Sequence, residues 1–522
     1  MEKDRLLKLV EAYQEHFKQY NRPDYNETEV RNDFVNPFFE ILGWDVQNKK
    51  NLPQHLREVK HEASVFVEEN GKQVKKKPDY EFHVGSTPYF FLETKKPNVD
   101  IMTSKEAAFQ TRRYGWNGNL EISVLSNFTD LVIYDTSVRP EENDKPSVAQ
   151  VAHFHFTEYV DKFDEISRLL SYETVISGDF EKTFANISSS LKKEPFDKYF
   201  LSQIKKWRLV LSKDIIKHNS IVKQGTLNIF VQKLINRIVF LRICEDRELE
   251  KYESLKNIGT YAELKRVFVA ADKKYDSGLF ELIEAEQFEI SDSILVDIFK
   301  ELYYPNSCYE FSIVDPFIIG QIYELFLEEE IVIKDGIVVA ERKPEIVDSQ
   351  GVVNTPKNIA DIIVKTTLAP LFSDEKFTEW DSYRIADICC GSGNFLLSAY
   401  EFIINRYIEY YMKNSLDMAI QKGLLISDVG NNFKLSYEKK REILRNNIWG
   451  VDIDILAVEV AKFSLLIKLI EDSSLYEMES FAKNNNCRIL PSLDNNIKNG
   501  NSLVDEKYIE FNSNILNDPE MV

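Results

Sequence analysis

Three charged residues on either side of a short turn have the types and spacing needed for chemistry on a phosphodiester. Asp79 precedes residues 85–88, a turn-forming Gly-Ser-Thr-Pro stretch, and Glu93 and Lys95 follow it. The β-prone runs on both sides of this stretch predict a hairpin. Side chains at i and i+2 of a strand share one face, so we expect Glu93 and Lys95 to lie together and Asp79 to approach them from the opposed strand.

A divalent cation would stabilise such an arrangement. Two carboxylates about 4 Å apart repel by about 4 kcal/mol at an effective dielectric constant of about 20, so one would protonate unless a cation lies between them. Oxygen ligands suit Mg²⁺, which can polarise a phosphodiester, while a neighbouring ammonium stabilises developing negative charge. The pattern predicts Asp79 and Glu93 as Mg²⁺ ligands and Lys95 as their electrostatic helper.

These residues resemble a known nuclease superfamily. Pro78-Asp79 together with Glu93-Thr94-Lys95 resembles the PD-(D/E)XK nucleases of type I and type IIG restriction proteins. The stretch from 38 to 45 is similar to that family's entry helix ending in Leu-Gly-Trp. The family also has a Gln-x-x-x-Tyr element that contacts the DNA backbone and a supporting helical glutamate, for which Glu29 is the candidate. The resemblance implies catalytic roles for Asp79, Glu93, Lys95, Gln110 and Tyr114 and metal ligation by Asp79, Glu93 and Thr94.

The surrounding elements predict a small mixed α/β domain. Apolar residues recur at helical spacing from Thr28 to Leu42, interrupted by Pro37. Further strands are predicted at 122–125 and 131–134. The domain is expected to close near residue 160.

A second constellation lies in the last third of the chain. The apolar run 384–390 leads into Gly391-Ser392-Gly393-Asn394 and then a helical stretch, 395–412. A strand, a glycine turn and a helix in this order can cradle a nucleotide. The spacing from Asp387 to the two glycines differs from the dinucleotide fingerprint, and no P-loop lysine follows. These departures disfavour NAD and ATP.

The glycine turn resembles motif I of the S-adenosylmethionine-dependent adenine methyltransferases. Asp452, at the end of the apolar run 447–453, resembles the ribose-binding acid of motif II. Residues 351–356 look like motif X, and 320–324 are similar to the helix before it. The resemblance implies a Rossmann-like S-adenosylmethionine-dependent methyltransferase core, incomplete in this sequence. The cofactor site would contain Thr355, Pro356, Asp387, Gly391, Gly393, Asn394, Asp452, Ile453 and, from motif III, Asn501.

One family element is missing from this sequence. Methyltransferases of this type hold a flipped adenine with Asn-Pro-Pro-Tyr, and the only Asn-Pro here is Asn36-Pro37. We therefore expect the chain to be part of a longer protein that continues with this motif and a target-recognition domain. Adenine N6 methylation of double-stranded DNA is expected from that longer protein.

Length and composition set wider limits. At 522 residues we expect about three domains in a multidomain α/β protein: an endonuclease domain at 1–160, a helical connector at 161–340 and a partial methyltransferase domain at 341–522. Five scattered cysteines support neither a disulfide framework nor a zinc site. The sequence has no bilayer-spanning run and no signal sequence, so we expect a cytoplasmic protein without a membrane partner. The oligomeric state stays open.

The net charge of −20 disfavours a protein that coats DNA non-specifically and leaves open a local DNA groove. Two alternatives to a restriction-modification enzyme remain. One is a phage-defence DNA methyltransferase with an inactive nuclease-like domain, and the other is a non-catalytic scaffold subunit. Metal-dependent cleavage would separate them. The basic residues that gather along the N-terminal domain are Lys72, Lys75, Lys76, Lys77, Lys95, Lys96, Arg112 and Arg113.

Overall fold

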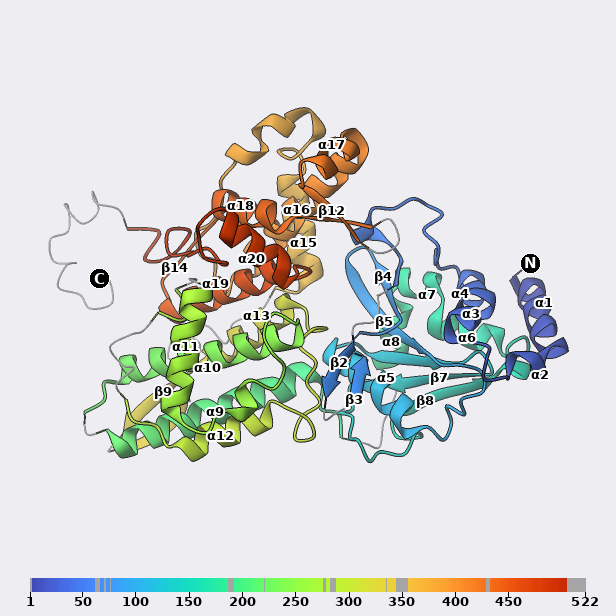
Figure 1. The fold of residues 1–522 in the computed structure, drawn as a ribbon, viewed down its shortest axis with the longest axis horizontal. Coiled ribbons are helices and arrows are strands. Elements are labelled where there is room, and N and C mark those ends of the chain that lie inside the picture. Colours follow the sequence, from blue (N-terminus) through green and yellow to red (C-terminus); the bar gives the residue numbers. More distant parts are fainter. Residues whose placement is uncertain are drawn as a thin grey trace. The chain divides into compact units, whose positions relative to one another are not determined.

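The chain folds into two compact units, each built of helices and strands (Figure 1). The computed structural model describes residues 2–61, 66–69, 72–75, 77–185, 192–219, 221–275, 278–281, 288–334, 336–343, 355–428 and 432–504. The first unit comprises residues 1–199 and 303–314, and the second comprises 200–302 and 315–522. The chain is thus a multidomain α/β protein, as predicted. The three-part division at 160 and 340 stays a prediction.

A six-stranded sheet in the order β1-β4-β5-β6-β7-β8 forms the framework of the first unit. Strands β5 and β6 are parallel, with helix α5 (Lys105–Asn117) connecting them, and the other neighbours are antiparallel. A separate hairpin joins β2 (Phe66–Glu69) to β3 (Lys72–Lys75). The strands of the main sheet are β1 (Val59–His61), β4 (Tyr80–Val84), β5 (Thr87–Thr94), β6 (Ile122–Ser126), β7 (Asp130–Asp135) and β8 (Gln150–His155).

Both faces of this sheet pack against other parts of the unit. Successive residues of a strand point to opposite faces, so neighbouring residues enter different core clusters. Val124 belongs to the large core cluster that includes the N-terminal helices, whereas its neighbour Leu125 packs in a smaller cluster with Ala107 and Ala108 of α5. Helix α5 is therefore fixed on one face of the sheet. The remaining helices of this unit are α1 (Glu2–Glu15), α2 (Phe17–Tyr20), α3 (Glu27–Val30), α4 (Asn36–Ile41), α6 (Phe163–Leu170), α7 (Tyr172–Ile176) and α8 (Asp179–Ala185), with the short turns η2 (Gln54–Leu56) and η3 (Phe156–Glu158).

The predicted hairpin is present as β4 and β5. Tyr80 pairs with Leu92, and continuing this register by one residue places Asp79 opposite Glu93. The predicted helix from Thr28 to Leu42 is also present, as α3, a π-helical turn η1 (Arg31–Val35) and α4. Pro37 lies in the first turn of α4, where a missing N–H costs little.

Residues 303–314 belong to the first unit although they are distant from it in sequence, and they support helix α5. The Arg113 guanidinium donates to the carbonyl oxygens of Cys308 and Tyr309 at 3.2 and 3.0 Å and lies 3.2 Å from the Glu310 carboxylate. The Asn117 amide donates to Cys308 O and accepts from Glu310 N, both at 2.8 Å. These buried contacts set the position of the helix that carries Gln110 and Tyr114.

The second unit contains a three-stranded parallel sheet, β11-β14-β15. Its strands are β11 (Ile385–Asp387), β14 (Ile448–Asp452) and β15 (Ile497–Asn499), and helix α16 (Asn394–Asn414) follows β11. Helix α19 (Ile455–Ile470) follows β14. The carboxyl ends of the strands meet at one edge, as in any parallel sheet.

Helices make up most of the rest of this unit. Two antiparallel hairpins interrupt them: β9 (Glu329–Lys334) with β10 (Ile337–Arg342), and β12 (Leu425–Asp428) with β13 (Asn432–Leu435). The β9–β10 hairpin lies at the end of the segment that the sequence predicts as a helical connector. The helices are α9 (Phe196–His218), α10 (Gln224–Asp246), α11 (Tyr261–Tyr275), α12 (Asp292–Glu301), α13 (Pro316–Leu327), α15 (Lys357–Leu368), α17 (Leu416–Gln421), α18 (Tyr437–Asn447) and α20 (Leu475–Asn484), with 3-10 turns η4 (Leu255–Asn257) and η6 (Asp374–Ser382).

Among the helices described here, none is both long enough and apolar enough to cross a membrane.

Candidate functional sites

Asp79 lies at the start of β4 with its carboxylate enclosed by donors. Its residue is 2% exposed, and its Oδ2 accepts from the backbone N–H and the hydroxyl of Thr94 at 2.7 and 2.6 Å. Its Oδ1 is paired with the guanidinium of Arg31, which also donates to Thr94 Oγ1 at 2.7 Å. Arg31 was not predicted from the sequence, because it lies 48 residues before Asp79 and belongs to no motif.

Glu93 and Lys95 form an ion pair at the end of β5. The Lys95 ammonium donates to Glu93 Oε1 at 2.6 Å and to Gln110 Oε1 at 3.3 Å. Burial lowers the pKa of Lys95, but the charge and hydrogen bond of Glu93, with weaker contributions from Glu27 and Asp79, raise it above the ordinary value. Glu93 and Gln110 therefore both contact one protonated lysine, Lys95. Asp79 lies close enough for its charge to raise the pKa of this lysine.

Tyr114 positions Gln110 rather than facing solvent. Its ring is 1% exposed, and its hydroxyl accepts from Gln110 Nε2 at 2.9 Å. Burial, reinforced by the nearby Glu93 charge, raises the pKa of Tyr114. Of these two residues, Gln110 is the one that is partly exposed.

Several other charged residues singled out from the sequence serve the fold. Arg112 is 1% exposed and pairs with Asp144 at 2.6 Å, and Arg113 pairs with Glu310, so neither faces a DNA groove. Glu29 is exposed and forms the capping box of α3 with Asn26. The helical glutamate beside the site is Glu27, which lies 3.8 Å from Arg31. Lys76 lies outside the described residues.

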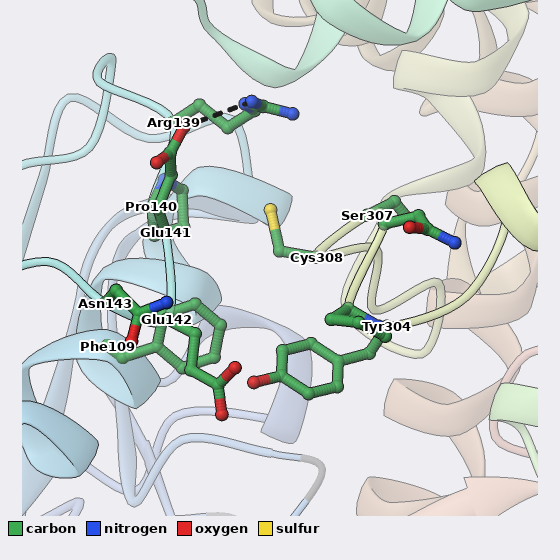
Figure 2. Close-up of a pocket in the computed structure, with 11 residues that line it drawn as sticks. Phe109, Arg139, Pro140, Glu141, Glu142, Asn143, Tyr304, Ser307 and Cys308 are labelled. Carbon is green, nitrogen blue, oxygen red and sulfur yellow. Dashed lines mark hydrogen bonds and ion pairs between the residues drawn. The ribbon is translucent and has the colours of Figure 1, made fainter.

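A pocket of about 230 Å³ opens elsewhere in the first unit, lined by residues of α5, the 139–143 loop and the 304–308 segment (Figure 2). Tyr304 and Glu142 point toward one another across it (Figure 2). Burial raises the pKa of the Cys308 thiol to about 11, which leaves it protonated near neutral pH. The pocket contains none of the predicted site residues and offers no activated nucleophile among the residues that line it.

The glycine turn of the second unit lies between β11 and α16. Gly391 and Gly393 have φ angles of +52° and +88°, values that favour glycine. A Cβ on Gly391 would meet nothing within 4 Å, whereas one on Gly393 would lie 3.1 Å from the Ala461 Cβ. The turn thus leaves open space beside Gly391 and packs closely against α19 at Gly393.

Asp452 ties this turn to the neighbouring strand. Its Oδ2 accepts from Gly391 N at 2.8 Å and its Oδ1 accepts from Asp454 N at 2.9 Å. Each carboxylate oxygen retains a second acceptor position for a ligand hydroxyl. Asp387 accepts from Cys389 N at 3.1 Å within the same turn. The two predicted acids therefore lie at the carboxyl edge of the parallel sheet and shape the backbone of the turn.

Two further residues at this edge were given no role from the sequence. Glu324 of α13 accepts from Ser392 Oγ at 2.8 Å and from Asn394 Nδ2 at 3.0 Å, and burial raises its pKa. The Asn499 amide donates to the carbonyl oxygens of Asp452 and Ile453 at 3.1 and 2.8 Å. Both residues fix the turn through partners that are distant in sequence.

The other predicted cofactor residues are placed as follows. Thr355 is half-buried and Pro356 exposed at the start of α15, which Lys357 links to α16 by a 3.0 Å ion pair with Glu401. Ile453 is 64% exposed directly after Asp452. Asn501 accepts from Leu503 N at 3.0 Å, so its amide oxygen shapes its own loop. Residues 351–354 of the predicted motif X lie outside the described residues.

Gly393→Ala is expected to destabilise the second unit more than Gly391→Ala. Both substitutions place alanine at positive φ, which costs roughly 1 kcal/mol, and only the first also drives a methyl group against Ala461. Thermal unfolding should show that Gly393→Ala lowers the free energy of unfolding by about 1 kcal/mol or more beyond the decrease caused by Gly391→Ala. Equal losses would contradict the close packing of the turn on α19.

Two family models match separate parts of the chain. Residues 24–142 match the type I restriction enzyme R protein N terminus, and residues 376–512 match the DNA-methyltransferase domain of MmeI. The chain is also 40% identical over 512 residues to the type II restriction enzyme and methyltransferase RM.Eco57I of Escherichia coli, an alignment that covers 96% of this chain and 50% of that protein. The chain is therefore similar to a type II restriction enzyme and methyltransferase along nearly its whole length. The two segments that the family models match contain Asp79, Glu93 and Lys95 in the first case and the glycine turn with Asp452 in the second.

The chain spans about half the length of this curated relative. Among solved structures it is similar to the DrdV–DNA complex, with 11% identity, a TM-score of 0.35 and coverage of 95% of this chain and 40% of that one. It is also similar to MmeI in complex with DNA, with 11% identity, a TM-score of 0.35 and coverage of 59% and 40%. Likeness at this level does not define the fold of either unit.

Proposed function

We propose that the first unit is a PD-(D/E)XK nuclease that hydrolyses DNA phosphodiesters with a divalent metal ion. We further propose that the second unit is a Rossmann-like core that binds S-adenosylmethionine. The observation that supports the nuclease most directly is the Lys95 ammonium, which lies between Glu93 and Gln110 beside the buried Asp79. A scaffold protein has no need for two carboxylates buried at the end of a hairpin, since burying a charge is costly.

The residues present fit a magnesium ion. Two buried carboxylates, Asp79 and Glu93, are each balanced by a cation of the protein, Arg31 and Lys95. In the described part of the chain no group of three or more His, Cys, Asp or Glu is placed to hold a metal. Mg²⁺ requires fewer protein ligands than this, since it is commonly held by one or two carboxylates and water. Asp79, Glu93 and the Thr94 carbonyl would hold the ion, which supplies Lewis acidity toward the phosphodiester.

The side chains around the proposed ion would have different roles. Lys95 places a positive charge where the phosphodiester gains negative charge. Gln110, held by Tyr114, presents its amide at the edge of the site. Arg31 neutralises Asp79 in the absence of a metal and would have to yield that position when an ion binds.

Arg31→Gln is therefore expected to raise the affinity of the site for Mn²⁺ and to lower stability in EDTA. Removing the partner of a buried charge costs about 3 to 5 kcal/mol, and the Asp79 side chain is fully buried. Calorimetric titration with MnCl₂ and thermal unfolding with and without metal measure the two effects. Arg22→Gln, an exposed arginine of the same unit, is the control. Unchanged Mn²⁺ affinity in Arg31→Gln would show that Arg31 does not compete with the ion.

In the second unit, the open space beside Gly391 and the carboxylate of Asp452 support a cofactor at the carboxyl edge of the sheet. Asp387, Gly393, Asn394, Ile453 and Asn501, with Thr355 and Pro356, would complete its surroundings. Adenine N6 methylation of double-stranded DNA is proposed for a protein that carries this chain together with an Asn-Pro-Pro-Tyr motif.

Two measurements test the proposal. Incubation with supercoiled plasmid should give nicked or linear DNA with Mg²⁺ or Mn²⁺ and none with EDTA. Calorimetry should detect binding of S-adenosylmethionine. Cleavage that persists in EDTA would exclude the proposed metal site. An absence of cofactor binding would exclude the proposed S-adenosylmethionine site of the second unit.

A further inference from the structure

An arginine-lined pocket of about 430 Å³ lies in the second unit, apart from the cofactor edge. Arg441 and Arg445 line it from α18, and Arg488, with Asn486 and Asn495, lines it from the segment between α20 and β15. No aspartate or glutamate is among the lining residues. Three arginines therefore line one concavity in a chain whose net charge is −20.

The position of this pocket separates it from the glycine turn. Arg445 lies just before β14, and Asn495 lies just before β15. The pocket therefore lies toward the amino ends of two strands whose carboxyl ends form the proposed cofactor site. A ligand in the pocket would be distinct from S-adenosylmethionine.

The arginines are only partly neutralised by the protein. Arg488 donates to the backbone oxygen of Asp272 at 3.1 Å and lies 3.6 Å from its carboxylate. Arg441 stacks over the Phe481 ring at 5.2 Å, and its buried Nε makes no hydrogen bond to the residues described. Throughout the described ranges, neither Arg441 nor Arg445 forms an ion pair with an acid. They are separated by one helical turn, where like charges repel one another.

A multiply charged oxyanion would satisfy these groups. A guanidinium offers donors in a planar fork that matches the oxygens of a phosphate, and the carboxamides of Asn486 and Asn495 add neutral donors. The pocket volume lies within the usual range for small-molecule sites. We propose that this arginine pocket binds a phosphate ester, supplied either by the DNA backbone or by a free phosphorylated ligand.

The first arm of the test uses pyrophosphate. It should raise the melting temperature of the wild-type chain and slow alkylation of Cys487, which lines the pocket, without slowing alkylation of the exposed Cys389. Both effects should disappear in the double variant Arg441→Gln/Arg445→Gln. The control is Lys365→Gln/Lys422→Gln, which removes the same charge from two exposed positions of the same unit.

The second arm measures binding of a labelled DNA duplex by fluorescence anisotropy over a range of NaCl concentrations. If the pocket holds backbone phosphates, the arginine double variant should lower the slope of log affinity against log salt by roughly 1 to 2, about 0.9 for each lost phosphate contact. The control should leave the slope unchanged. A pyrophosphate effect without a change in slope would assign the pocket to a free phosphate ester.

The proposal is overturned if the arginine double variant matches wild type in both arms. The variant Arg441→Lys/Arg445→Lys keeps both charges but loses the planar donors of the guanidinium groups, so it should retain part of the binding. Partial binding by this variant would show that the loss in the glutamine variant is not caused by misfolding. This inference is independent of the proposed nuclease. Wild-type protein that fails to cleave DNA but responds to pyrophosphate would reject the nuclease and keep the pocket.

Discussion

Lys95→Ala should reduce metal-dependent DNA cleavage by about a hundredfold to a thousandfold or more, the usual cost of removing one group that stabilises transition-state charge. The ammonium lies 2.6 Å from Glu93 and 3.3 Å from Gln110, so its loss removes the positive charge at the centre of the site. Rates of plasmid nicking at saturating Mg²⁺ measure the effect. Lys95→Arg should recover only part of the activity, because a guanidinium differs from an ammonium in shape.

The matched control is Lys96→Ala, which removes the same charge from the adjacent, half-exposed position. Its cleavage rate should remain within a few-fold of wild type. Thermal unfolding of both variants shows whether Glu93, left without its lysine, has disturbed the fold. Cleavage by Lys95→Ala at the wild-type rate would remove this site from the mechanism.

Asp452→Ala should weaken S-adenosylmethionine binding by about a hundredfold or more. The carboxylate accepts from the backbone N–H groups of Gly391 and Asp454, and alanine removes both bonds together with the acceptor proposed for the ribose. Hydrogen bonds to charged groups contribute about 1.5 to 3 kcal/mol each. Asp452→Asn keeps one acceptor oxygen and should lose only about tenfold. Calorimetric titration compares the two variants.

Asp417→Ala removes an exposed carboxylate of α17 in the same unit and serves as the control. It should bind the cofactor with unchanged affinity. If Asp452→Ala binds as tightly as wild type, Asp452 has no role in the pocket, and the cofactor, if bound, lies elsewhere.

Features that depend on local sequence were predictable. The β4–β5 hairpin follows from its turn residues, and the i, i+2 rule places Glu93 beside Lys95. In the same way, the glycine turn between β11 and α16 was evident from a strand, two glycines and a helix in succession. In each case the determinants lie within about a dozen residues.

Features that depend on distant contacts were not predictable. Arg31 reaches Thr94 across 63 residues, and nothing around Arg31 indicates an acidic partner. Arg112 and Arg113 appear as a basic pair in the sequence. Both are buried, however, and form ion pairs with Asp144 and Glu310, which lie far along the chain. The β9–β10 and β12–β13 hairpins were not predicted for a different reason. Their strands are close in sequence, but charged residues between apolar ones also suit helices.

The contribution of residues 303–314 to the first unit has a consequence for chimeric enzymes. A graft that exchanges only residues 1–199 for those of a relative would part Arg113 from Glu310, whose side chains are 7% and 0% exposed. Breaking such a pair costs about 3 to 5 kcal/mol, and here it would loosen the helix that presents Gln110. An exchange of the first unit between relatives must therefore transplant two stretches of gene at once.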